Sequence, residues 1–152
     1  TAPGAGVVRV LAVAGHALSG AELVGCLRPQ TAEVTGEAVR HLVDRNLVVE
    51  DGEDRYRLTH ALVAEVVVAD LASVQRQDTH RAVARALVEA GGTRRAAEIA
   101  GHFAASGDSD EELPWALVAA EQSDRRGIER NAICPGDLVG RANPSIALFA
   151  CE

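Results

Sequence analysis

Apolar residues recur at helical spacing in the first third of the chain. Val8, Leu11, Val13 and Leu18 form an imperfect stripe, which predicts a helix over Val7–Leu18. The motif Ser19-Gly20-Ala21-Glu22 has the spacing of a capping box, in which the serine hydroxyl and the glutamate carboxylate bond each other's backbone amides. A short second helix is therefore predicted over 21–27, ended by Pro29.

The pattern then changes from helix to strand. Thr35 is predicted to cap a third helix over 36–46, with apolar residues on one face. Two β-prone segments follow, 47–50 and 55–59, separated by the polar turn 51–54, which contains Asp-Gly. Three short helices and a small hairpin are typical of a winged helix.

Helical spacing resumes after His60. The predicted helices are 61–71, 78–90, 94–105 and 114–124. The first is apolar around most of its circumference, so we expect it to be well buried. Thr93 should cap the third, and Gly91-Gly92 and Gly107 should end the helices before them.

The expected fold is mainly α: a winged helix followed by antiparallel, tetratricopeptide-like helices. Three segments are predicted: a winged-helix domain with its trailing helix at 1–72, a helical-repeat arm at 73–124, and an irregular tail at 125–152. The tail is set apart by its prolines, its glycines and its lack of periodicity.

Composition narrows the possible functions. The 152 residues carry a net charge of −7, and all 15 basic residues are arginine. The absence of lysine excludes a P-loop lysine or a Schiff base within this chain. An acidic chain lacks the attraction to phosphates that underlies most nucleic-acid affinity. Three cysteines without a CxxC motif favour a reduced, cytoplasmic setting. No apolar run is long enough to span a membrane. The absence of methionine suggests that the sequence is a piece of a longer protein.

One stretch resembles a known family. Residues 42–52 (LVDRNLVVEDG) and 55–65 (RYRLTHALVAE) resemble bacterial signal-transduction ATPases, the large LuxR-type and cyclase-linked transcriptional regulators. The resemblance continues through 80–87 (HRAVARAL) and 97–103 (AEIAGHF), and covers about 7–123. It implies a non-catalytic regulatory module that couples the nucleotide state of a preceding ATPase core to a helical arm. ADP or ATP would bind in the parent protein, and no cofactor would bind in this segment. The partners would be the core of the same chain and proteins that bind the repeats.

His60 is the sharpest candidate residue that this resemblance supplies. It lies where the second hairpin strand meets a helix, the position at which plant disease-resistance ATPases carry a Met-His-Asp motif. The histidine there contacts the β-phosphate of ADP, so a nucleotide-sensing role in the parent protein is implied for His60. The alternative is a structural histidine that caps the helix start.

Other constellations are weaker. His60, His80 and His102 lack the spacing of metal ligands, so no metal site is expected, and interhelical hydrogen bonds or packing explain the last two better. No catalytic motif is present, so an enzyme is not expected. A free-standing winged-helix DNA-binding regulator remains the alternative, although the third helix carries Glu37 and Asp44 among its polar residues and makes a poor DNA-reading surface.

Overall fold

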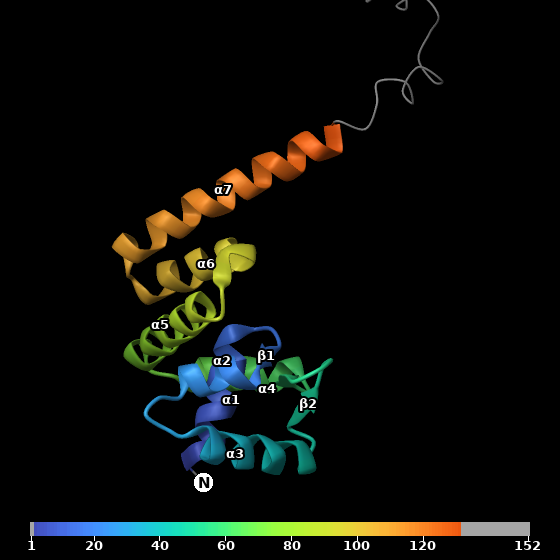
Figure 1. The fold of residues 1–152 in the computed structure, drawn as a ribbon. Coiled ribbons are helices and arrows are strands. Elements are labelled where there is room, and N and C mark those ends of the chain that lie inside the picture. Colours follow the sequence, from blue (N-terminus) through green and yellow to red (C-terminus); the bar gives the residue numbers. More distant parts are fainter. Residues whose placement is uncertain (1, 132–152) are drawn as a thin grey trace, which may run out of the picture. The chain divides into compact units, whose positions relative to one another are not determined.

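The computed structural model describes the backbone of residues 2–131 and the side chains of residues 3–125. Within this part the chain is mainly α, with seven α-helices and one small antiparallel sheet (Figure 1). The elements are α1 (Ala2–Ala14), β1 (Leu18–Ser19), α2 (Gly20–Cys26), α3 (Ala32–Asp44), β2 (Val48–Glu50), β3 (Arg55–Leu58), α4 (Ala61–Asp70), α5 (Ser73–Glu89), the 3₁₀ turn η1 (Gly92–Arg95), α6 (Ala96–Ser106) and α7 (Ser109–Asn131).

The capping box at the start of α2 is confirmed. The Ser19 hydroxyl accepts from the Glu22 amide at 3.2 Å, and the Glu22 carboxylate accepts from the Ser19 amide at 2.8 Å. The first helix, however, ends at Ala14 rather than Leu18. Gly15 takes a left-handed backbone (φ +73°) that a helix cannot continue, and Leu18 enters a strand instead.

The cap of the third helix was predicted one turn too late. Thr31, not Thr35, is the N-cap of α3, because its hydroxyl accepts from the Val34 amide at 3.3 Å. Thr35 lies inside the helix and is buried. Both threonines precede helical residues, and the sequence alone did not favour the earlier one.

The predicted hairpin is present, and it belongs to a three-stranded sheet. β2 and β3 pair antiparallel with Val48 opposite Leu58, while β1 pairs with the other edge of β3 through Leu18 opposite Tyr56. The strand order is therefore β1-β3-β2. The two-residue strand β1 was not predicted, since its pairing depends on β3, almost forty residues further along the chain.

One hydrophobic cluster runs through both halves of the described chain. Val7, Val10 and Leu11 of α1 belong to the same cluster as Leu87 of α5 and Phe103 of α6. The sheet contributes Leu18 and Val48, and α3 contributes Val39 and Leu42. The predicted boundary at residue 72 lies between α4 and α5, and this cluster crosses it.

α4 contradicts the prediction that it is well buried. None of its ten residues is buried, and Leu62 and Val66 are 71% and 68% exposed. The helix packs mainly on α1. Apolar residues lie around most of its circumference, so one contact of this kind leaves much of its apolar surface uncovered.

Two of the later helices, α5 and α7, begin earlier than predicted, and α6 begins two residues later than predicted. α5 begins at Ser73 because the Gln75 side chain accepts from the Ala72 amide at 3.3 Å. α6 begins at Ala96, since 92–95 form a 3₁₀ turn, and Thr93 therefore does not cap an α-helix. α7 begins at Ser109 and carries Pro114 inside it. Gly91 (φ +89°) and Gly107 (φ +81°) do end the helices before them, as predicted.

The chain divides into two compact units, Thr1–Ala119 and Ala120–Glu152. The described part of the second unit is the end of α7, so residues 125–131 are helical rather than irregular as predicted. The prediction for 132–152 lies outside the described residues. Within the described part, no helix combines the length and the apolar character needed to cross a bilayer.

Candidate functional site

His60 lies at the N-cap position of α4, directly after β3. Its backbone is extended (φ −126°, ψ 131°), and its carbonyl accepts from the Val63 amide at 3.1 Å. The side chain is exposed and makes no capping hydrogen bond. The ring of His60 therefore takes no part in starting the helix, and the nucleotide-sensing role implied for it stays a prediction.

The other two histidines of the predicted triplet do meet. Nδ1 of His80 on α5 lies 2.8 Å from Nδ1 of His102 on α6, and the ring centroids are 5.1 Å apart. This confirms an interhelical hydrogen bond as the explanation for the pair. Burial, with smaller contributions from the charges of His80 and His16, lowers the pKa of His102 to about 4. Burial and then Arg76 lower the pKa of His80 as well.

A polar cluster that the sequence analysis did not identify surrounds His102. His16, in the loop after α1, contacts the carboxylate of Glu98 through Nε2. Its ring lies edge-on to the ring of His102, with 6.2 Å between the two ring centroids. The metal-ligating atoms of His16, Glu98 and His102 all lie within 4.8 Å of one another. The spacing of Glu98 and His102, one turn apart on α6, was the signal in the sequence that could have identified two of the three.

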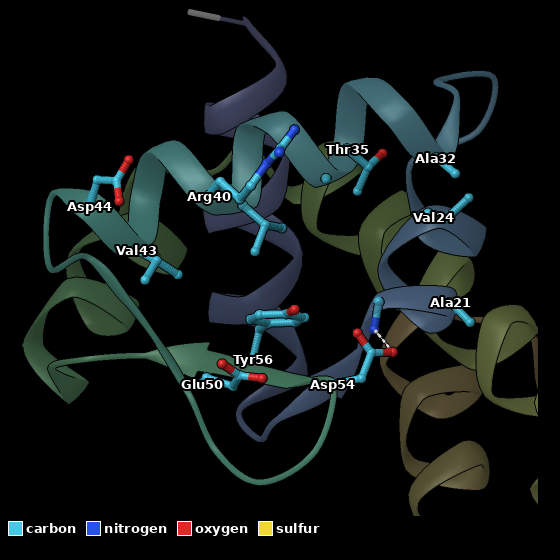
Figure 2. A pocket seen from close by; sticks show the side chains of 13 residues that line it. Ala21, Val24, Ala32, Thr35, Arg40, Val43, Asp44, Glu50, Asp54 and Tyr56 are labelled. Atoms are coloured by element: carbon cyan, nitrogen blue, oxygen red, sulfur yellow. Dashed lines mark hydrogen bonds between the residues drawn. The ribbon is translucent and has the colours of Figure 1, made fainter.

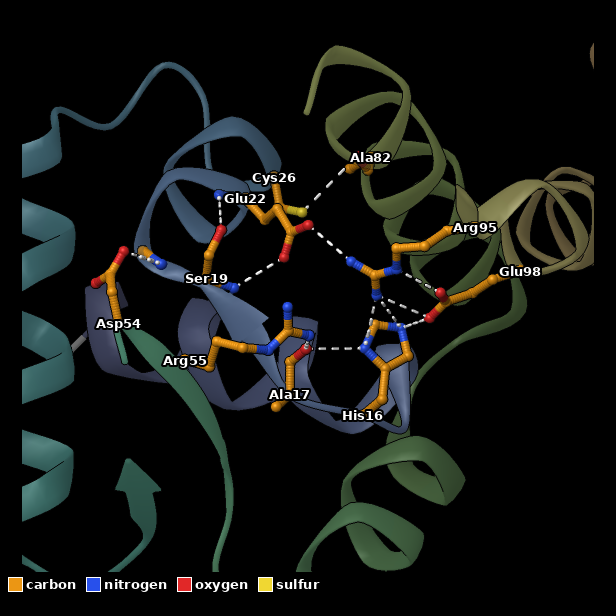
Figure 3. Close-up of polar contacts among 11 residues, drawn as sticks. His16, Ala17, Ser19, Glu22, Cys26, Asp54, Arg55, Ala82, Arg95 and Glu98 are labelled. Carbon is orange, nitrogen blue, oxygen red and sulfur yellow. Dashed lines mark hydrogen bonds and ion pairs between the residues drawn. The ribbon is translucent and has the colours of Figure 1, made fainter. Parts of the chain in front are cut away.

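Arg95 connects this cluster to α2 (Figure 3). Its guanidinium donates to Glu98 at 2.6 and 3.0 Å and to Oε1 of Glu22 at 2.7 Å. Nη2 also lies 3.1 and 3.3 Å from the two ring nitrogens of His16. Burial alone would raise the pKa of Glu98, but the hydrogen bond from Arg95 and the neighbouring positive charges lower that pKa below its ordinary value.

A second feature is a groove bounded by α2, α3 and the hairpin, with a volume of about 720 Å³ (Figure 2). Its lining includes the apolar side chains of Val24, Val39 and Val43, together with Arg40 and Tyr56. The Thr35 hydroxyl is buried at its wall without a hydrogen-bond partner. Burial, followed by the charges of Asp54 and Glu50, raises the pKa of Tyr56. The groove therefore suits an apolar group better than an anion.

Apart from the groove, two places carry polar side chains that could bind a ligand. They are the exposed start of α4 at His60, and the cluster of His16, Arg95, Glu98 and His102. Comparison with protein-family models, curated proteins and solved structures finds no match for this chain.

Proposed function

We propose that this chain is a non-catalytic regulatory module of an ATP-dependent bacterial transcriptional regulator. The first part would be a winged helix, and α5 and α6 would begin a tetratricopeptide-like arm. The element order α1-β1-α2-α3-β2-β3, with β3 between the other two strands, supports this proposal because a winged helix has the same order. The resemblance of residues 42–65 to the regulator ATPases supports it independently of the geometry.

The observation that carries the proposal is the uncovered surface of α4. Leu62 and Val66 of α4 expose most of their side chains. Exposed apolar side chains gathered on one element are typical of a surface that another protein part covers. In the proposed parent, that part is the nucleotide-binding core of the same chain.

His60 fits the same proposal. It starts α4 with an exposed ring that the rest of the described chain does not hold. An imidazole N–H can donate to a phosphate oxygen near neutral pH. A donor that contacts ADP and not ATP would favour the resting state of a switch with two conformations. Release of that contact would then free the module, and the movement would pass to the helical arm.

Charge argues against the DNA-binding alternative. The exposed residues of α3 include Glu33, Glu37 and Asp44 beside Arg40. The turn of the hairpin, Asp51–Asp54, carries three acids. The helix and the turn that would approach DNA in a winged helix are therefore both rich in negative charge, which phosphates repel.

The test is made in the intact protein, joined to its nucleotide-binding core. His60→Ala should weaken ADP binding about 10- to 100-fold and ATP binding less, since a lost phosphate hydrogen bond costs about 1.5–3 kcal/mol. His41→Ala, which changes another exposed histidine, on α3, is the matched control. Equal losses for the two nucleotides would contradict the sensing role, and absence of nucleotide binding in the intact protein would contradict the whole proposal.

A second measurement addresses the alternative. Fluorescence anisotropy with random-sequence duplex DNA at low salt should show no binding by the chain. Binding that weakens steeply as salt is added would favour the DNA-binding regulator instead.

A further inference from the structure

Three potential metal ligands converge from two distant parts of the chain. Glu98 and His102 lie one turn apart on α6, and His16 reaches them from the loop after α1. Their ligand atoms lie within 4.8 Å of one another. Tetrahedral zinc, with bonds of about 2.0–2.1 Å to nitrogen and oxygen, holds such atoms roughly 3.3 Å apart. The separations between the ligand atoms therefore have to shrink by at most about 1.5 Å for the three ligands to bind one ion.

Nδ1 of each histidine has a hydrogen-bond partner, so Nε2 is the nitrogen that can serve as the metal ligand. Nδ1 of His16 lies 3.1 Å from the Ala17 carbonyl, and in the tautomer that donates to this carbonyl Nε2 carries the lone pair that a metal ion needs. In the metal-free protein Nε2 contacts Glu98 and lies 3.3 Å from Nη2 of Arg95. Nδ1 of His102 is engaged by His80, which leaves Nε2 of His102 free. Ligating histidines in metal sites are held in this way by a partner on their other nitrogen.

The burial of the three residues and the atoms that they offer are also suitable for a metal ion. His102 is 7% exposed, while His16 and Glu98 are half-buried, so the group lies at the edge of the core with access from solvent. Two imidazoles and a carboxylate form a donor set that zinc and its neighbours in the first transition row accept. Three protein ligands leave one position of a tetrahedral ion for water.

Arg95 now supplies the positive charge in this cluster. Its guanidinium contacts both Glu98 oxygens and both His16 ring nitrogens, and it also donates to Glu22. A metal ion would take over its contacts with His16 and Glu98, and Arg95 would keep its bond to Glu22. Arg95 therefore competes with the metal and lowers its affinity.

From this geometry we infer that His16, Glu98 and His102 form a binding site for a divalent transition-metal ion of the zinc class. A bound ion would fasten the loop after α1 to α6. The site does not depend on the function proposed above, since none of its residues lies in α4.

The experiment uses the full chain, purified with a chelator and titrated with Co²⁺ and then Zn²⁺. We expect one Co²⁺ per chain with visible absorption of tetrahedral character, its displacement by Zn²⁺, and a higher melting temperature with Zn²⁺. His16→Asn and Glu98→Gln should each weaken Zn²⁺ binding by at least about 10-fold. His41→Ala, on the exposed face of α3, should leave the affinity unchanged.

Arg95→Gln tests most directly whether Arg95 competes with the metal ion for His16 and Glu98. It removes the competing charge, so Zn²⁺ should bind several-fold more tightly even though the metal-free protein is less stable. Circular dichroism of each variant establishes that it is folded. If His102→Gln does not fold, His16→Asn and Glu98→Gln decide the matter. Absence of binding, unchanged affinity in these two variants, or a thiolate-to-cobalt absorption band that places the metal on cysteine would each overturn the proposal.

Discussion

Arg95 and Glu22 are 73 positions apart in the sequence, and their side chains meet with Nη1 of the arginine 2.7 Å from Oε1 of the glutamate. Glu22 is only 6% exposed, and its other oxygen accepts from the Ser19 amide. A single carboxylate thus completes the capping box of α2 and holds the residue that precedes α6. The start of a short helix is therefore coupled to the second half of the chain.

Removing the Arg95 side chain should lower the free energy of unfolding. Arg95→Ala leaves a buried carboxylate without its cation, so the free energy of unfolding should fall by about 2–4 kcal/mol. Urea denaturation measures this loss. Arg28→Ala, which breaks the exposed pair of Arg28 and Glu89, is the matched control and should cost less than about 1 kcal/mol. Similar losses in the two variants would show that the burial of Glu22 does not matter.

Gly92 allows a close approach between η1 and α5. A Cβ at this position would lie 2.7 Å from the Leu87 carbonyl oxygen and 2.3 Å from Cδ1 of Ile99. Gly92→Ala should therefore lower the free energy of unfolding by about 1–3 kcal/mol. Gly101→Ala, on the open side of α6 with no atom within 4 Å, should raise it by up to about 1 kcal/mol. Thermal melts of both variants test this contrast, and a stable Gly92→Ala would contradict it.

The exposure of α4 makes a prediction about this chain by itself. Leu62→Gln and Val66→Gln should each change the free energy of unfolding by less than about 0.5 kcal/mol, since both side chains already lie largely in solvent. Leu87→Ala in the core should cost about 2–5 kcal/mol. Large losses in the α4 variants would mean that α4 is covered within this chain, and would remove the argument for a partner on its surface.

Cys26 should be unreactive at neutral and mildly alkaline pH. Burial, with smaller contributions from the charges of Glu22 and Glu89, raises the pKa of its thiol from 9.0 to about 12. Because the thiolate is the reactive form, its alkylation at pH 8 should be roughly 1,000-fold slower in the folded protein than in urea. Replacing Cys134 and Cys151 by serine isolates the signal, and mass spectrometry measures the rate. Equal rates in the two conditions would contradict the raised pKa.

Features set by neighbouring residues could be predicted from the sequence. The capping box of Ser19 and Glu22 depends on residues three apart, and its side chains found the partners that the motif predicts. Gly107 ended its helix because a left-handed residue there is a local requirement. The hairpin at 51–54 followed from the same kind of signal. The placement of Thr35 failed because two adjacent turns offered similar caps, and only the packing of α3 separates them.

Features that depend on distant partners could not be predicted. Valine and leucine spacing in α4 indicated that its surface should be covered, but the covering element is not specified by the spacing. His16 and Glu98 are 82 positions apart, and nothing near His16 in the sequence indicates a carboxylate beside it. The pairing of Leu18 with Tyr56 is of the same kind, since a two-residue strand has no pattern of its own.

The central place of α1 in the core has a consequence for synthesis on the ribosome. Val7, Val10 and Leu11 are synthesised before Leu87 and Phe103, with which they are buried. At typical rates of translation the intervening stretch takes roughly 5 to 20 s to make. During that interval α1 can already pack on α3 and α4, but it lacks the core neighbours that α5 and α6 supply.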